Sequence, residues 1–249
     1  SANAMMFLVG VVICSSLVMV PQFLQTLLGY TAELAGLVLS LGAVLLLIEM
    51  PIVGELTSKV QARYLIAFGW LSMALAMLYS TRQFGLFLDF RTATYIRVAQ
   101  VVGIGFLFVP ITLAAYVGMP QEKSNMISGM VNFMRNMGSS VGTSLVTTMI
   151  ARRSQYHQTV LVGYVTPQSS TYLNGVSGLP NQLIQAGLNP DDAQMRAHAT
   201  LYRVVQRQAA TLAYIDTFWA LGIVAAIMFA LSFTLKRNVP GTGAQLAEG

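Results

Sequence analysis

The chain has 249 residues, of which 55% are hydrophobic and only 9% are charged, and its mean hydropathy is +0.64. Because soluble domains carry about 25% charged residues, most of the surface must face lipid, and a water-soluble globular domain is excluded. The net charge of +5 is scattered without a dense basic run, so nucleic-acid binding is not expected, and the single cysteine, Cys14, excludes an intramolecular disulfide.

Six stretches reach the length of about 20 mostly apolar residues that a membrane-spanning helix needs. The sequence therefore predicts an all-α, polytopic membrane protein with six transmembrane helices. In chain order they cover Ala4–Leu28, Glu33–Glu55, Tyr64–Ser80, Ala93–Val117, Met126–Ile150 and Thr211–Leu235. Because residue 1 is not Met and the first span begins almost at once, we expect the chain to be part of a longer or processed protein.

The predicted domains are residues 1–150 with helices one to five, a long loop over 151–210, and the last helix with a tail over 211–249. Within the loop, Asn189 suits a helix cap, Pro190 suits the first helical position, and the acids Asp191 and Asp192 complement the helix dipole. A helix over Ala193–Gln208 is expected to run into the last span.

A polar stripe crosses the fifth predicted span. It follows helical spacing and consists of Asn132, Arg135, Asn136, Ser139 and Thr143. An ionisable group at membrane depth costs about 2.5 kcal/mol or more, so the stripe is expected to face a protein partner or a water-filled cavity. It either belongs to the transport pathway or forms a structural network between helices.

Glu49 is the candidate proton site. It precedes Pro51 near the end of the second span, where a carboxyl group in a partly dry site can bind and release protons. The alternative is that Glu49 reaches the membrane interface and pairs with Lys59 or Arg63.

Two further polar pairs lie in predicted spans. Arg97 and Gln100 share a face of the fourth span and either line a cavity or, for Arg97, extend outward to the interface. Gln22 and Gln25 share a face of the first span and either line the cavity or make structural hydrogen bonds.

Enzyme signatures are absent from the sequence, including metalloprotease, hydrolase, redox and phosphate-binding motifs. Two histidines are too few to argue for a metal centre. We therefore expect no enzyme, no metal and no cofactor, and an ion gradient or a separate subunit as the energy source for any transport. Gly138-x-x-x-Gly142 is a pattern of small residues that permits close helix packing.

The sequence resembles a known family in two motifs. Pro21-Gln22-Phe23-Leu24-Gln25 resembles the start of the C-terminal half of the fourteen-span drug:proton antiporters, the EmrB/QacA-like branch of the major facilitator superfamily. Asn132-Phe133-Met134-Arg135 with Ser140-Val141-Gly142-Thr143-Ser144 resembles the pattern of their penultimate span. The resemblance covers essentially the whole chain.

The resemblance implies a C-terminal half-bundle of a major facilitator fold in the bacterial inner membrane, with the loop over 151–210 outside the cytoplasm. It implies proton-coupled efflux of hydrophobic or cationic drugs by alternating access, together with a missing N-terminal half. Arg135, Asn132, Asn136, Gln22, Gln25, Gln100 and Arg97 would line or brace the substrate cavity. Gly54, Lys59 and Arg63 match or replace residues of a cytoplasmic loop that gates the inner face. The alternative is a non-transporting membrane subunit that docks a periplasmic adaptor protein through the long loop.

Overall fold

The computed structural model describes residues 2–116, 124–164, 180, 183–185, 187 and 189–234. Residues 165–179, 181, 182, 186 and 188 of the predicted loop, and residues 235–249 of the predicted C-terminal tail, lie outside these residues. Every statement below concerns the described residues alone.

Six long helices form the described chain, and no described residue lies in a strand. They are α1 (Ala2–Thr26), α2 (Ala32–Lys59), α3 (Ala62–Gln83), α4 (Phe90–Tyr116), α5 (Ser124–Tyr164) and α7 (Pro190–Ser232). Five of them, all except α5, contain a stretch long and apolar enough to cross a membrane. The prediction of an all-α, polytopic membrane protein is confirmed.

Helix α5 differs from the prediction in two respects. It does not meet the hydropathy that marks the other five helices as spans, because the polar stripe lowers the hydropathy of its N-terminal half. It also continues to Tyr164, so residues 151–164, which we expected in a loop, are helical. The sixth transmembrane helix stays a prediction.

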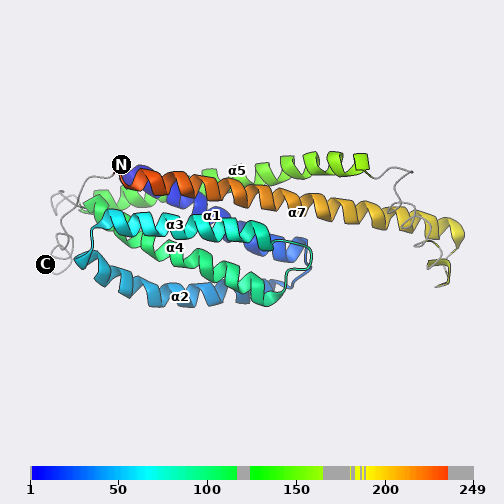
Figure 1. Cartoon of the computed structure of the whole chain (residues 1–249), viewed down its shortest axis with the longest axis horizontal. Coiled ribbons are helices and arrows are strands. Elements are labelled where there is room, and N and C mark those ends of the chain that lie inside the picture. The colour runs from blue at the N-terminus through cyan, green and yellow to red at the C-terminus, as the bar shows by residue number, and fades with distance from the viewer. Residues whose placement is uncertain are drawn as a thin grey trace. The chain divides into compact units, whose positions relative to one another are not determined.

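The chain divides into two compact units, one of residues 1–147 with 215–249 and one of residues 148–214. In the first unit, α1 to α4 run lengthwise beside one another, and α4 lies between α2 and α3 (Figure 1). No residue of α4 from Ile96 to Tyr116 is exposed. Helix α4 is therefore the central element against which side chains of α1, α2 and α3 pack.

The second unit consists of the end of α5 and the start of α7. Its two helices are joined by a hydrogen bond from Gln158 Nε2 to the Tyr202 hydroxyl at 3.0 Å. Helix α7 begins at Pro190 and runs without interruption to Ser232, and the backbone N–H of Ala193 donates to the Asn189 carbonyl at 2.8 Å. The predicted helix start, and its continuation into the last span, are confirmed.

Local interactions explain where α2 and α4 begin and why α2 reaches Lys59. Thr31 caps α2 by accepting a hydrogen bond from the Leu34 N–H at 3.3 Å. Asp89 caps α4 in the same way through Thr92 at 3.3 Å, and hydrogen bonding to Thr92 holds the pKa of Asp89 below its usual value. An ion pair between Glu55 and Lys59, four residues apart, extends α2 to Lys59.

The predicted gating loop is therefore mostly helical. Gly54 and Lys59 lie within α2, and Arg63 lies in the first turn of α3, so the connection between these helices is only Val60 and Gln61. The loop that the resemblance implies is thus shortened to two residues, because the Glu55–Lys59 pair and the helix-compatible residues around it continue α2.

Three glycines bring α1 and α5 into backbone contact. A Cβ atom added to Gly138 would overlap the carbonyl oxygen of Phe7, and one added to Gly142 would lie 2.6 Å from the Val11 Cα. On α1, a Cβ atom added to Gly10 would overlap the backbone of Arg135 in α5. The Gly138-x-x-x-Gly142 pattern thus serves packing within this chain.

Candidate functional site

A buried hydrogen-bond network joins α1, α3 and α4. Arg97 is only 4% exposed, and its Nη1 donates to Ser16 Oγ at 3.5 Å and to Gln100 Oε1 at 3.4 Å. Gln100 in turn donates from Nε2 to Ser80 Oγ at 3.2 Å. Arg97 does not extend outward to the interface: its guanidinium is held inside the bundle by neutral oxygens.

The seam between α2 and α4 holds two ionisable side chains against glycines. A Cβ atom added to Gly42 would lie 3.1 Å from the Arg97 Cγ, and one added to Gly105 would lie 2.6 Å from the Glu49 Cδ. Arg97 of α4 thus packs on a glycine of α2, and Glu49 of α2 packs on a glycine of α4. The two contacts follow the same order along both helices, so α2 and α4 run parallel.

Glu49 has the environment of an isolated carboxyl group. It is 8% exposed, and neither of its carboxyl oxygens has a hydrogen-bond partner among the described residues. The pairing of Glu49 with Lys59 is not seen, because Lys59 pairs with Glu55 instead. Nor does Arg63 pair with it, since its described hydrogen bond goes to the Tyr64 hydroxyl at 2.6 Å.

Arg135 lies on α5 in the same unit. It is half-buried, and its guanidinium carbon lies 5.4 Å from the centre of the Phe108 ring of α4. Such a position over an aromatic face is a cation–π contact, which stabilises a guanidinium; no carboxylate of the described residues pairs with Arg135. Asn132 and Asn136 lie on exposed positions beside it.

No family model matches the chain. The multidrug export protein EmrB of Escherichia coli is 26% identical over 221 residues, which cover 89% of this chain and 42% of EmrB. The probable multidrug resistance protein EmrY of E. coli is 31% identical over 150 residues, 60% of this chain and 29% of EmrY. The MFS-type transporter YhcA of Bacillus subtilis is 24% identical over 215 residues, 86% of this chain and 40% of YhcA.

Over most of its length the chain is similar to EmrB-like transporters of the major facilitator superfamily. It is a multi-pass protein of the bacterial inner membrane, and the relatives carry the names of transport proteins rather than of enzymes. The chain spans about two fifths of the length of EmrB, the first of these relatives.

This EmrB-like segment separates the predicted cavity residues into three groups. Arg97 and Gln100 are buried together on α4. Arg135, Asn132 and Asn136 lie together on α5. Gln22 and Gln25 are exposed near the end of α1, whereas Arg135 packs beside Gly10 of the same helix. At 1.5 Å of rise per residue, Gln22 is about 18 Å further along α1, so the structure does not bring the two glutamines to Arg135.

Ser16, Ser80 and Gly42 are members of this site that the sequence argument missed. Both serines are fully buried within spans, at 0% exposure. A small polar residue inside an apolar span is the signal that could have identified the serines. The seat that Gly42 provides for Arg97 has no signal in the sequence.

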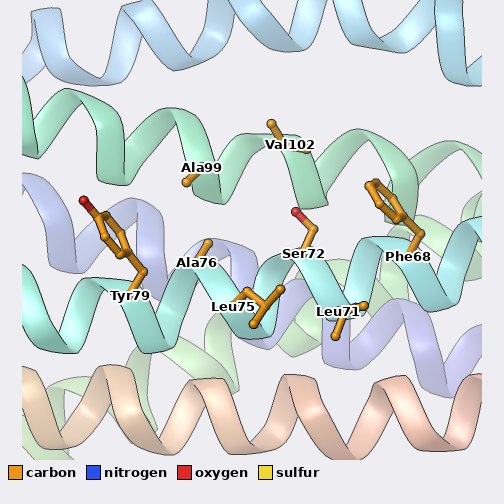
Figure 2. A pocket seen from close by; sticks show the side chains of 8 residues that line it. All are labelled: Phe68, Leu71, Ser72, Leu75, Ala76, Tyr79, Ala99 and Val102. Carbon is orange, nitrogen blue, oxygen red and sulfur yellow. The ribbon is translucent and has the colours of Figure 1, made fainter.

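A separate apolar groove of about 390 Å³ runs between α3 and α4 of the EmrB-like bundle (Figure 2). Apart from the hydroxyl groups of Ser72 and Tyr79, its lining is hydrocarbon. It is lined by Phe68, Leu71, Ser72, Leu75, Ala76, Tyr79, Ala99 and Val102. None of the predicted site residues lines it, and Ala99 lies on the opposite side of α4 from Arg97.

Replacing Gly105 with alanine tests the seat of Glu49. The added methyl group would lie 2.6 Å from the Glu49 Cδ, so the seam must open or the glutamate must leave, and we expect a loss of about 1–3 kcal/mol. Thermal unfolding of the purified protein in detergent measures this loss. Gly36→Ala on α2 is the matched control, because nothing lies within 4 Å of a Cβ atom there. Equal melting temperatures for the two variants would show that Glu49 does not pack tightly against Gly105.

Proposed function

We propose that the chain forms one half of an exporter that moves hydrophobic or cationic drugs out of the cell in exchange for protons. Transport would proceed by alternating access, in which this half and a second six-helix half rock about a site near the middle of the membrane. The proposal is supported by the likeness to EmrB, which is named a multidrug export protein. The second half, the protons and the drugs are all part of the proposal.

The observation that carries the proposal is the polar face of α5. Asn132 and Asn136 are exposed and Arg135 is half-buried in this unit. A guanidinium in the middle of a bilayer costs about 2.5–3.5 kcal/mol on insertion scales. A face with one guanidinium and two amide side chains is therefore suited to a second protein half or a water-filled cavity rather than to lipid.

Glu49 is the proposed proton site of this half. Its carboxyl group is buried in the α2–α4 seam, and no described donor contacts either oxygen. A carboxyl group without donors is accommodated most easily in its neutral form, because burying a charge without a partner is costly. Opening of the seam to water on one side of the membrane would let the proton leave, which is the step that exchange requires.

Gly54, Lys59 and Arg63 are proposed to take part in gating the inner face. Gly54 and Lys59 lie in the last two turns of α2, and Arg63 lies in the first turn of α3. Since the ion pair of Lys59 with Glu55 is exposed, its contribution to stability is expected to be small, so it can break and reform during closure.

Replacing Glu49 with glutamine tests the proposed function. We expect Glu49→Gln in the full-length transporter to lower drug uptake into inverted membrane vesicles driven by a pH gradient at least tenfold. Uptake should fall because glutamine cannot carry the exchanged proton. Drug binding to the purified variant should persist, because glutamine keeps the size of the side chain. Uptake with and without the gradient, together with proton release on drug addition, measures the effect.

Glu33→Gln is the matched control for this experiment. Glu33 is the acid in the first turn of the same helix, and it is exposed. Uptake by the control should equal that of the unmodified protein. If Glu49→Gln also transports at the unmodified rate under a pH gradient, Glu49 is not the proton site.

A further inference from the structure

Helix α4 brings Glu49 and Arg135 to one level of the bundle. Glu49 of α2 packs against Gly105, and the Arg135 guanidinium of α5 lies over the Phe108 ring. Gly105 and Phe108 are three residues apart on α4, which corresponds to about 4.5 Å of rise and to the same side of the helix. The acid and the cation thus approach α4 from two different helices within one turn.

The other charged groups near Glu49 are already engaged. Across the seam on α4, Arg97 donates to Ser16 and Gln100. It packs at Gly42, seven residues before Glu49, which is about 10 Å along α2. On α2 itself, Glu55 is paired with Lys59. Among the described residues, Arg135 is the cation at the level of Glu49 whose contact is an aromatic face rather than hydrogen-bonding oxygens.

We propose that Arg135 is the counter-charge of Glu49. When the Glu49 carboxyl group gives its proton to water on the open side of the bundle, the carboxylate leaves the Gly105 seat and pairs with the Arg135 guanidinium. When a proton returns from water to the carboxylate, the ion pair is lost, Glu49 returns to its seat, and Arg135 returns to the Phe108 ring. This proposal rests on the proton site proposed above.

Two physical arguments support the exchange. A carboxylate that left a dry seat without a partner would remain a buried, uncompensated charge, whereas the planar guanidinium can bind both its oxygens at once. The pairing would also link α2 to α5. Both helices contact the central helix α4 through these side chains. Protonation of one residue would in this way change how two helices are held.

The test measures binding of a fluorescent cationic drug to the purified full-length transporter as a function of pH. We expect Glu49→Gln to remove the pH dependence. We expect Arg135→Gln to move its midpoint at least tenfold toward lower proton concentration, because the carboxylate has lost its counter-charge. The double variant Glu49→Gln/Arg135→Gln should show the flat profile of Glu49→Gln, and Arg135→Lys, which keeps the charge, should stay within about threefold of the unmodified midpoint.

Different results separate this inference from the proposed function. A pH dependence that survives in Glu49→Gln overturns the proton site itself. A flat profile for Glu49→Gln combined with an unshifted midpoint for Arg135→Gln leaves the proton site standing and overturns the pairing. A shift in Arg97→Gln with none in Arg135→Gln assigns the counter-charge to the buried network and also overturns the pairing.

Discussion

We expect Arg135→Ala in the full-length transporter to abolish drug resistance while its amount in the membrane stays unchanged. Arg135 is half-buried and contacts Phe108 through its guanidinium, so truncation removes a charge from a partly exposed position without opening the core. Arg135 lies in the predicted fifth span, where a charge is costly, so its removal should not hinder insertion. Growth of a drug-sensitive strain over a drug dilution series, together with immunoblots of its membranes, measures both quantities.

Two variants control for this result. Arg135→Lys keeps the positive charge and loses the planar fork, so we expect partial resistance. Arg152→Ala removes an exposed arginine further along the same helix, and resistance should be retained in full. Unchanged resistance of Arg135→Ala at equal membrane abundance would refute a role for Arg135 in transport.

The bounds of a helix could be predicted from the sequence where an apolar run matches the thickness of the membrane. They were predicted less well where a helix continues through polar residues. The apolar runs located α1 to α4, and the Asn189-Pro190-Asp191 signal located the start of α7. The continuation of α5 beyond Ile150 was missed because Arg152 and Arg153 end the apolar run while the helix goes on. Hydropathy reports contact with lipid, whereas a helix continues wherever its backbone hydrogen bonds can form.

The candidate site was predicted less completely than the fold. Helical spacing correctly placed Arg97 and Gln100 on one face, and they share a hydrogen bond. It could not indicate that Arg97 meets Ser16, 81 residues away, or that Gln100 meets Ser80, 20 residues away. Periodicity fixes the face of a residue on its own helix, and the partner helix is fixed only by the packing of the whole bundle.

The same distinction applies to the glycines. Gly105 and Gly138 belong to small-residue patterns visible in the sequence, which indicate that some helix approaches closely. The structure shows that the first receives a side chain, Glu49, and the second receives the backbone of Phe7. A side chain can rotate away from an added methyl group, whereas a backbone carbonyl moves only if the helices separate.

We therefore expect Gly138→Ala to be more damaging than Gly105→Ala. The added methyl group would overlap the Phe7 carbonyl oxygen, so α1 and α5 must part and lose their close packing around Gly142. Overpacking costs about 1–3 kcal/mol and occasionally more, and a clash with rigid backbone belongs at the upper end of this range. Detergent-solubilised yield and the melting temperature of the purified protein measure the loss.

Gly129→Ala is the matched control for Gly138→Ala, because both glycines lie in α5 and nothing is within 4 Å of a Cβ atom at Gly129. Alanine favours helix over glycine by about 1 kcal/mol, so the control should be as stable as the unmodified protein or more so. The same chemical change in one helix is thus expected to destabilise the protein at Gly138 and not at Gly129. If both variants melt together, α1 and α5 do not pack through Gly138, and the position that this packing gives Arg135 beside Phe108 loses its support.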